Sequence, residues 1–451
     1  MIFNQIVKGG GAPPAPAIEE KDVNFYDYDG TRLYSYTKSE FLGLSELPPT
    51  VNSEGLTSQG WNWTLSGAKE VVQETGFLDI GQIMRTSDRK NRLYVTIPEE
   101  YRFIEITFGG TGEKFVDWGD GEPFDGLFTH RYQQAGDYVI TFWTSNDDLE
   151  FDDDKCTHLI RCPGTPAEGS DYDIYWHAPY RALVNKIEFG ASSIYFNNFG
   201  VLEEYVNLKS ICLPNGTNLS EDQPFITKAD LKCLVVPNTV EVIPSDFYVS
   251  NNTIERIIFS ENTTSFYLPP DSYNIYGLEH LCLGKVTNTG VIDGIFTKMV
   301  VPSSVEEINT LGNDNILRSL VVYGSPTFGT ISSSSFNSMA HMEFRNATPP
   351  TITNSTIFDN YASMCYVYAP FDSAFQYLST PNFPQPGDHI SGIMFGTYES
   401  GASLPNTLGP YTIFWYATRT DAELAAIGIS GIQTITEGNG EEVYAVAFTL
   451  G

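Results

Sequence analysis

The sequence has few basic residues. Among its 451 residues, 25 are Lys or Arg and 56 are Asp or Glu, which gives a formal net charge of −31 at pH 7. A chain this acidic is repelled by phosphate backbones and by anionic lipid, so we expect no direct nucleic-acid partner. Hydrophobic residues nevertheless make up 41% of the chain and aromatic residues 14%, which indicates a folded protein, because disordered acidic chains carry few aromatics.

Long apolar runs are also missing. No stretch reaches the roughly 18 apolar residues of a membrane-spanning helix. The N-terminal segment MIFNQIVKGG lacks the apolar core of about 7 to 15 residues that marks a secretory signal. We therefore expect neither membrane insertion nor export by the signal-peptide route.

Cysteine is scarce, with six in the chain. Four lie in or beside short apolar strands, where a thiol packs well: Cys212, Cys233, Cys282 and Cys365. Cys156 and Cys162 are close enough in sequence to be bridged or to share a metal, and the sequence does not decide between these two states and free thiols. Free thiols fit a chain that folds in a reducing cytoplasm.

Signatures of catalysis are absent too. The six histidines are dispersed, and the chain has no H-E-x-x-H, no G-x-S-x-G and no phosphate-binding loop. Carboxylate pairs are abundant, so a glycosidase stays open as an alternative. We expect a protein that is not an enzyme and that holds no cofactor.

The strongest positive signal is a set of nine short apolar strands, most of them 18 to 25 residues apart. A repeat of this length predicts a stacked solenoid, because a single unit cannot bury its own apolar face. The nine strands are Ile187–Phe189, Ile211–Leu213, Leu234–Val236, Ile257–Phe259, Leu281–Leu283, Met299–Val301, Leu320–Val322, Met342–Phe344 and Tyr366–Tyr368.

Several of these strands are followed by a proline and a short recurring phrase. In two of them the phrase reads Pro-x-x-Val-x-x-Ile: Pro237, Val240, Ile243 and Pro302, Val305, Ile308. This pattern resembles the BspA-like leucine-rich repeat, which implies a strand, such a segment and a short helix in each turn of about 23 residues. The resemblance implies a solenoid over residues 182–380, closed by a cap with a helix at 371–378. A β-helix is the main structural alternative.

Residues 93–151 have a purely β pattern. The pieces VDWGDG and THRYQQAGDYVITF resemble a PKD-type immunoglobulin-like domain, which implies a β-sandwich that serves as a spacer or a binding module. Asp120 is expected to form a turn. The matching residues are Trp118, Gly119, Asp120, Gly121, His130, Tyr132, Gly136 and Tyr138.

An acidic run, NDDLEFDDDK, follows and leads into a connecting segment, residues 152–181. Its carboxylates offer the oxygen ligands that calcium prefers, although their spacing is not that of an EF-hand loop. Charge runs are usually solvated, so calcium is an alternative here and no metal is the first expectation. The residues concerned are Asp147, Asp148, Asp152 and Asp153.

Two small α+β units flank this central part, which makes the expected fold class mostly β and multidomain. In residues 22–92, a hairpin turns at Asp29-Gly30, helices are predicted at 39–44 and 65–75 with Ser66 or Thr64 as a cap, and Trp61 and Trp63 are assigned to the core. In residues 381–451, strands are predicted at 411–416 and 442–449. A helix capped by Thr420 is predicted at 420–426.

The N-terminus combines a short apolar peptide, residues 1–8, with a Gly/Pro-rich linker, residues 9–21. The peptide can add as a strand to the sheet edge of another protein, and a frayed terminus is the alternative. The proposed anchoring residues are Met1, Ile2, Phe3, Asn4, Gln5, Ile6 and Val7.

This combination of units resembles bacteriophage structural proteins. The resemblance implies a non-enzymatic virion protein that is assembled in the host cytoplasm. It would be a head fibre, a capsid decoration, a tail fibre or a tail-associated adhesin. Its partners would be other virion proteins at the N-terminal peptide and a host or mucosal surface protein or glycan at the repeats. A homotrimer is among the assemblies that this allows. The alternatives are a bacterial cell-surface leucine-rich-repeat adhesin and a glycan-active enzyme with accessory modules.

Overall fold

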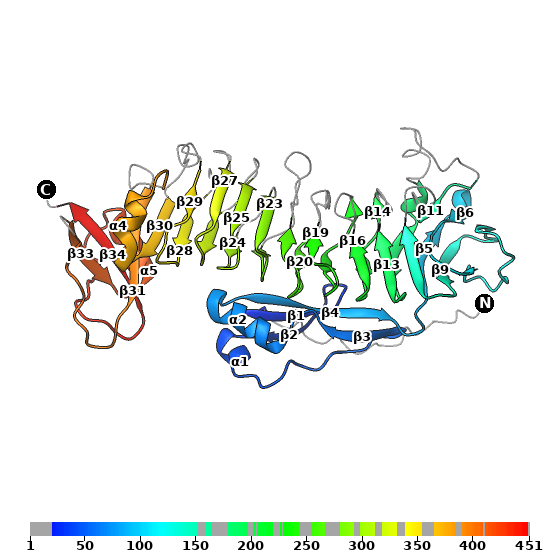
Figure 1. Ribbon diagram of the computed structural model, residues 1–451, viewed down its shortest axis with the longest axis horizontal. Helices are drawn as coiled ribbons and strands as arrows, with labels where there is room; N and C mark the ends of the chain where they lie inside the picture. Colours follow the sequence, from blue (N-terminus) through cyan, green and yellow to red (C-terminus); the bar gives the residue numbers. More distant parts are fainter. Residues whose placement is uncertain are drawn as a thin grey trace, which may run out of the picture.

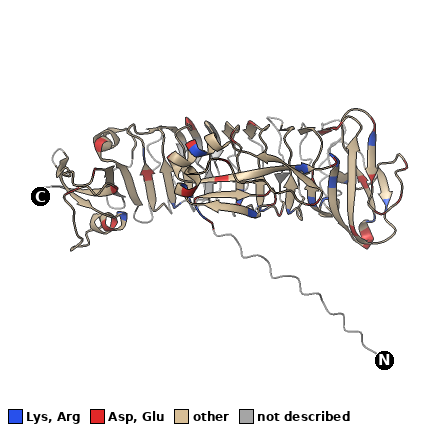
Figure 2. Cartoon of the chain, turned by 90° about the horizontal axis from the view of Figure 1, so that it is seen from below, with Lys and Arg blue, Asp and Glu red and all other residues tan. Residues whose placement is uncertain are grey.

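The protein is an elongated, mostly β rod with a small unit packed along one flank (Figure 1). The computed structural model describes residues 20–151, 159–163, 179–196, 202–203, 205–219, 226–227, 229–243, 254–266, 280–292, 298–311, 318–331, 339–353, 365–383, 390–408 and 411–449. None of the described helices is both long and apolar enough to cross a membrane. Seen from below, the positions of acidic residues are spread along the length of the rod (Figure 2).

The flanking unit is a four-stranded sheet, in the order β2-β1-β4-β3, with two helices. The expected hairpin forms, with Gly30 at φ 89° in its turn. Thr64 caps α2 by accepting a hydrogen bond from the Gly67 amide, and the predicted core residues Trp61 and Trp63 are buried. The elements are β1 (Val23–Tyr26), β2 (Arg32–Tyr36), α1 (Lys38–Leu42), β3 (Leu56–Trp61), α2 (Leu65–Thr75) and β4 (Leu78–Thr86).

The next segment forms two facing sheets, in the orders β11-β6-β8 and β15-β12-β5-β9-β7. The second of these sheets runs on into the solenoid, because β5 pairs antiparallel with β12. The elements are β5 (Asn91–Ile97), η1 (Glu99–Tyr101), β6 (Phe103–Ile106), β7 (Lys114–Asp117), β8 (Thr129–Arg131), β9 (Gly136–Thr144), β10 (Asp148–Phe151) and β11 (Ile160–Arg161).

The solenoid is confirmed, and its parallel pairing runs from residue 186 to residue 395. All nine strands expected from the sequence form one side of the rod, which we call the first face. They are β12 (Val184–Glu188), β15 (Ser210–Cys212), β18 (Cys233–Val235), β20 (Arg256–Ile258), β22 (His280–Cys282), β24 (Lys298–Val301), β26 (Ser319–Val322), β28 (His341–Phe344) and β30 (Cys365–Pro370).

A second set of parallel strands, which the sequence did not reveal, forms the opposite side, or second face. It begins with β10, which pairs in parallel with β13. It continues through β13 (Ser193–Phe196), β16 (Thr217–Leu219), β19 (Val242–Ile243), β21 (Ser265–Phe266), β23 (Asn288–Ile292), β25 (Glu307–Leu311), β27 (Thr327–Ile331) and β29 (Thr351–Ile352). A short parallel pair, β14 (Leu202–Glu203) and β17 (Ile226–Thr227), lies beside them.

The recurring proline phrase forms the corner between the two faces. The Val240 amide donates to the Pro237 carbonyl at 3.1 Å, and the Val305 amide donates to the Pro302 carbonyl at 3.2 Å. Both valines are buried, and a strand of the second face follows each of them. The part of each turn where the resemblance implies a helix lies mostly outside the described residues.

The far end of the rod is closed by the C-terminal segment. β31, which the sequence did not reveal, pairs in parallel with β30 and antiparallel with β34. Thr418 caps α5 by accepting from the Asp421 amide, so the expected cap Thr420 is wrong: it lies inside the first helical turn. The elements are η4 (Phe371–Ser373), α4 (Ala374–Ser379), β31 (Ile390–Thr397), β32 (Thr407–Leu408), β33 (Tyr411–Tyr416), α5 (Arg419–Ala426) and β34 (Glu442–Thr449).

Candidate functional site

Several of the residues singled out in the sequence lie outside the described residues. These are the proposed anchor, Met1 to Val7, the aspartates 152 and 153 of the acidic run, and Cys156. Of the four cysteines assigned to packing, Cys212, Cys233 and Cys365 are buried free thiols. Cys162, whose state the sequence left open, is partly buried.

The two described aspartates of the acidic run bind protein groups. Asp147 accepts hydrogen bonds from Arg89 Nη1 at 3.0 Å and from Ser192 Oγ at 2.5 Å. Asp148 accepts from the Thr111 amide at 3.0 Å and from Thr144 Oγ1 at 2.8 Å. Both carboxylates therefore tie loops to the start of the second face.

The W-G-D-G turn is held by aromatic and charged side chains. His130 Nε2 lies 2.6 Å from Asp120 Oδ2, and the His130 ring stacks on Trp118 with 5.0 Å between the ring centroids. Asp120 Oδ1 also accepts from the Glu122 amide at 3.2 Å. Asp120, Glu122 and His130 are the one group of three potential metal ligands found in the described part of the chain. Their contacts with each other account for the turn without a metal.

The flanking unit covers part of the first face. Cys212, Cys233, Val235 and Ile258 point outward from the solenoid, yet all four are buried beneath the unit, against the strands β1 and β4 and the loops beside them. Glycine allows the close approach at one point, because a Cβ at Gly81 would lie 2.3 Å from Val235 Cγ1. The part of the first face beneath the flanking unit is therefore not accessible to a partner.

Polar groups fix the position of the unit on the solenoid. Asn62 Nδ2 donates to the carbonyls of Ile258 at 3.3 Å and Phe259 at 3.1 Å, and the Trp63 indole donates to the Phe259 carbonyl at 2.9 Å. Arg256 Nη1 lies 3.0 Å from Asp79 Oδ2. Buried carbonyls need hydrogen-bond donors, and Asn62 and Trp63 supply them only when the flanking unit is docked in this position on the solenoid.

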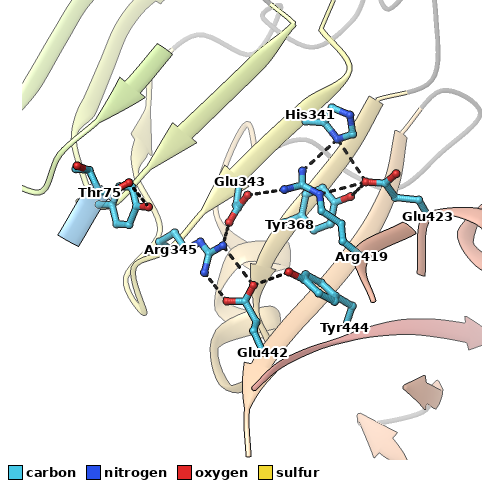
Figure 3. Close-up of polar contacts among 10 residues, drawn as sticks. Thr75, His341, Glu343, Arg345, Tyr368, Arg419, Glu423, Glu442 and Tyr444 are labelled. Atoms are coloured by element: carbon cyan, nitrogen blue, oxygen red, sulfur yellow. Dashed lines mark hydrogen bonds and ion pairs between the residues drawn. The ribbon is translucent and has the colours of Figure 1, made fainter. Parts of the chain in front are cut away.

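Near the other end, a charged network links α5 and β34 to β28 and the residue that follows it, Arg345 (Figure 3). The buried Glu343 accepts from Arg419 Nη1 at 2.9 Å and forms an ion pair with Arg345. Arg345 also pairs with Glu442, and Arg419 Nε lies 3.2 Å from Glu423 Oε1. The three carboxylates therefore share two arginines, with Glu343 in contact with both.

One part of the first face lies next to this network and is only partly covered. Four residues on consecutive strands are directly in register: Lys298, Ser319 and His341, which begin β24, β26 and β28, and Tyr366, the second residue of β30. Lys298 is exposed and the other three side chains are partly exposed. The rings of His341 and Tyr366 stack at 5.6 Å with 23° between their planes. We call these four residues the outer strip and take it as the candidate functional site.

The sequence contained a signal for this strip that its apolar pattern concealed. The apolar residues Met299, Leu320, Met342 and Val367 identified the strands, and each strip residue stands immediately before one of them. Because side chains alternate in a strand, a polar residue before an apolar one points outward.

A second candidate surface is a hollow beside α4. Its volume is about 350 Å³, and it is lined by uncharged residues that include Pro350, Thr351, Gln376, Ser379 and Thr380. It adjoins β29, which is the last strand of the second face. No charged side chain lines it.

A scan against protein-family models and searches of the curated proteins and of the solved structures find no match to this chain.

Proposed function

We propose that this chain is a non-enzymatic bacteriophage virion protein, of the head-fibre, capsid-decoration or tail-associated adhesin type. In this proposal it is anchored by residues 1–7 and presents the solenoid to a host or mucosal surface. The observation that carries the proposal is a rod with both ends closed and its lateral faces left for binding.

The closure of both ends supports a lateral role. At one end the first face continues through β12 into the antiparallel strands β5, β9 and β7. At the other end it continues into β31, β34, β33 and β32. An open solenoid end would expose apolar surface and pairing edges. Contacts with partners therefore fall on the sides of the rod.

The place where the described chain begins supports an anchor on the flank. Glu20 Oε2 lies 2.8 Å from Arg256 Nη2, on β20 near the middle of the solenoid. The linker at residues 9–21 thus joins the rod at its side. An anchored peptide would hold the rod from the flank that the small unit covers and leave the second face and the outer strip free.

Within this proposal, the solenoid belongs to the BspA-like leucine-rich repeats and residues 93–151 to the PKD-like domains. The equivalent corners at Pro237 and Pro302 support the first assignment, since both place a buried valine before a strand of the second face. The contacts of Trp118, His130 and Tyr132 support the second, because they join the two matching sequence pieces.

Deletion of residues 1–17 tests the anchor. We expect the shortened chain to fold with an unchanged melting temperature and to be missing from purified particles. Retention at full occupancy would overturn the anchor. The matched control replaces residues 9–17 with a Gly/Ser linker of equal length, which keeps the peptide and should keep particle binding.

A further inference from the structure

We propose that the outer strip binds an acidic polysaccharide, a sugar polymer that carries carboxylate or sulfate groups. This inference rests on the proposed function and deepens it by naming the class of surface molecule and the residues that recognise it.

Unpaired positive charge is the first argument. In a chain with 25 basic and 56 acidic residues, basic side chains are expected to find acidic partners. Arg256, Arg345 and Arg419 all do so. Lys298 and Arg318 are exposed, and neither forms an ion pair with any described residue. They come from neighbouring turns, since Lys298 is in register with Ser319. Charge complementarity favours an anionic ligand here.

A row of hydrogen-bond donors is the second argument. His341 Nδ1 lies 3.1 Å from Arg419 Nη2 and 3.6 Å from Glu423 Oε1. A guanidinium only donates, so the tautomer that accepts from Arg419 at Nδ1 carries its proton on Nε2. His341 is in register with Ser319 and Tyr366 on the adjacent strands, and both of these residues carry a hydroxyl group. The strip therefore offers one donor per strand at a spacing of about 4.8 Å.

The nearby carboxylates do not cancel this pattern. Glu343 accepts from Arg419 at 2.9 Å and pairs with Arg345 as well. Glu423 pairs with Arg419 at 3.2 Å. With Glu442, the three acids share the two arginines, so the network carries a net charge of −1 at the β28 and β30 end of the strip. Lys298 lies on β24 and Arg318 stands just before β26, so the basic side chains without a described acidic partner are at the other end, where an approaching anion meets them.

The position of the strip favours a polysaccharide over an extended peptide. Peptides that join a sheet bind its edge, where backbone groups are unpaired. The outer strip is on the face of a sheet whose backbone groups already pair between β24, β26, β28 and β30. Recognition must then come from side chains, and a line of donors suits a polymer that carries acceptors on every unit. Four strands give a length of about 14 Å, which suits a short oligosaccharide.

The test uses the full chain and calorimetric titration with four probes: a chondroitin sulfate hexasaccharide, an oligogalacturonate of equal length, maltohexaose as the neutral sugar, and hexaglutamate as the acidic peptide. We expect saturable binding of at least one acidic sugar that weakens at high salt, with no binding of maltohexaose or hexaglutamate. Equal binding of maltohexaose would overturn the role of charge. Equal binding of hexaglutamate would overturn the sugar class in favour of an acidic protein.

Variants then locate the site. Lys298→Gln and Tyr366→Phe should each weaken binding of the acidic sugar, by about tenfold for the charge, which is the scale of one charge-assisted hydrogen bond. Lys209→Gln is the matched control, because Lys209 is also exposed and also precedes a strand of the first face, β15. It should bind like the native chain. Equal loss in all three variants, or loss in none, would overturn the strip as the site.

Absence of binding to every probe would also overturn the strip. It would leave the virion proposal intact, because the deletion of residues 1–17 tests particle attachment without any glycan. Melting temperatures of the variants should match that of the native chain, since the side chains removed are at least partly exposed.

Discussion

Single residues hold the W-G-D-G turn through contacts between the segments that follow β7 and β8. The hydroxyl group of Tyr132, which is fully buried, donates to the Trp118 carbonyl at 2.9 Å. If a buried carbonyl loses its hydrogen-bond donor, the free-energy cost of removing it from water is no longer offset. This hydrogen bond explains why a tyrosine stands two residues after His130.

We expect Tyr132→Phe to lower the free energy of unfolding by about 1 to 3 kcal/mol, because it leaves that carbonyl unpaired. Tyr138→Phe is the control. Its hydroxyl donates to the Gln134 carbonyl in an exposed position, so water replaces the lost bond. Urea denaturation of both variants measures the difference, and equal effects would contradict the account.

Asp27 makes stability depend on pH. Burial is the main cause that raises the pKa of this carboxyl from 3.8 to about 6, with nearby Asp29 adding to the rise. The ordinary pKa of an unfolded aspartate is about 3.9. Because its pKa is higher in the folded state, the native protein binds the Asp27 proton more tightly than the unfolded chain does. Protonation of Asp27 therefore adds fully to the free energy of unfolding below about pH 4, and this addition is lost as pH rises through about 6.

Asp27→Asn should therefore flatten the dependence of stability on pH between about 4 and 7, with a gain at pH 7 of roughly 1 to 3 kcal/mol. The asparagine keeps the oxygen that accepts from the Tyr28 amide. Denaturation midpoints at pH 4.5 and 7.5 provide the measurement. An unchanged difference between the two pH values would show that Asp27 does not titrate in this window.

At the scale of elements, β4 packs closely on β18. The backbone of β4 at Gly81 contacts the Val235 side chain of β18 with no other side chain between them. Gly81 lies at this point, and its amide donates to Asn62 Oδ1 at 2.8 Å. A methyl group at Gly81 would overlap Val235 and push the flanking unit away from the first face. Shape at this contact therefore controls docking.

A double-mutant cycle tests the contact. Gly81→Ala should destabilise the chain by about 1 to 3 kcal/mol through overpacking, and Val235→Ala by a similar amount through a cavity. The double variant should lose less stability than the sum of the losses in the two single variants, with a coupling energy of about 0.5 to 3 kcal/mol. Gly136→Ala is the control, since its nearest contact would be 3.6 Å. Additive effects would contradict direct packing of β4 on β18.

Some of these elements could be predicted from sequence and some could not. Strands such as Leu234–Val236 were recognisable because every residue is apolar. That pattern also fits burial on both sides, so the outward Cys233 and Val235 carried a signal that the sequence analysis missed: another element covers the first face there. The polar Ser319 and His341 mark where the cover ends. Part of the second face escaped notice because its two-residue strands, such as Ser265–Phe266, are too short to show a period.

At the scale of the whole molecule, the rod is asymmetric in its free surface. The flanking unit occupies the first face from β15 to β20, and its α2 end reaches further, where the Tyr323 hydroxyl donates to the Thr75 carbonyl at 3.2 Å. The outer strip follows, and then α5. Held by the flank near Glu20, the rod would present the strip and the second face outward.

A cryo-EM map of purified particles that carry this chain tests the central claim most directly. We predict density for the rod at fixed, symmetry-related positions, with residues 1–7 seated on a particle protein and the outer strip facing solvent. A map with no density for the rod at such positions, or with the rod attached through the outer strip while residues 1–7 contact nothing, would contradict the account.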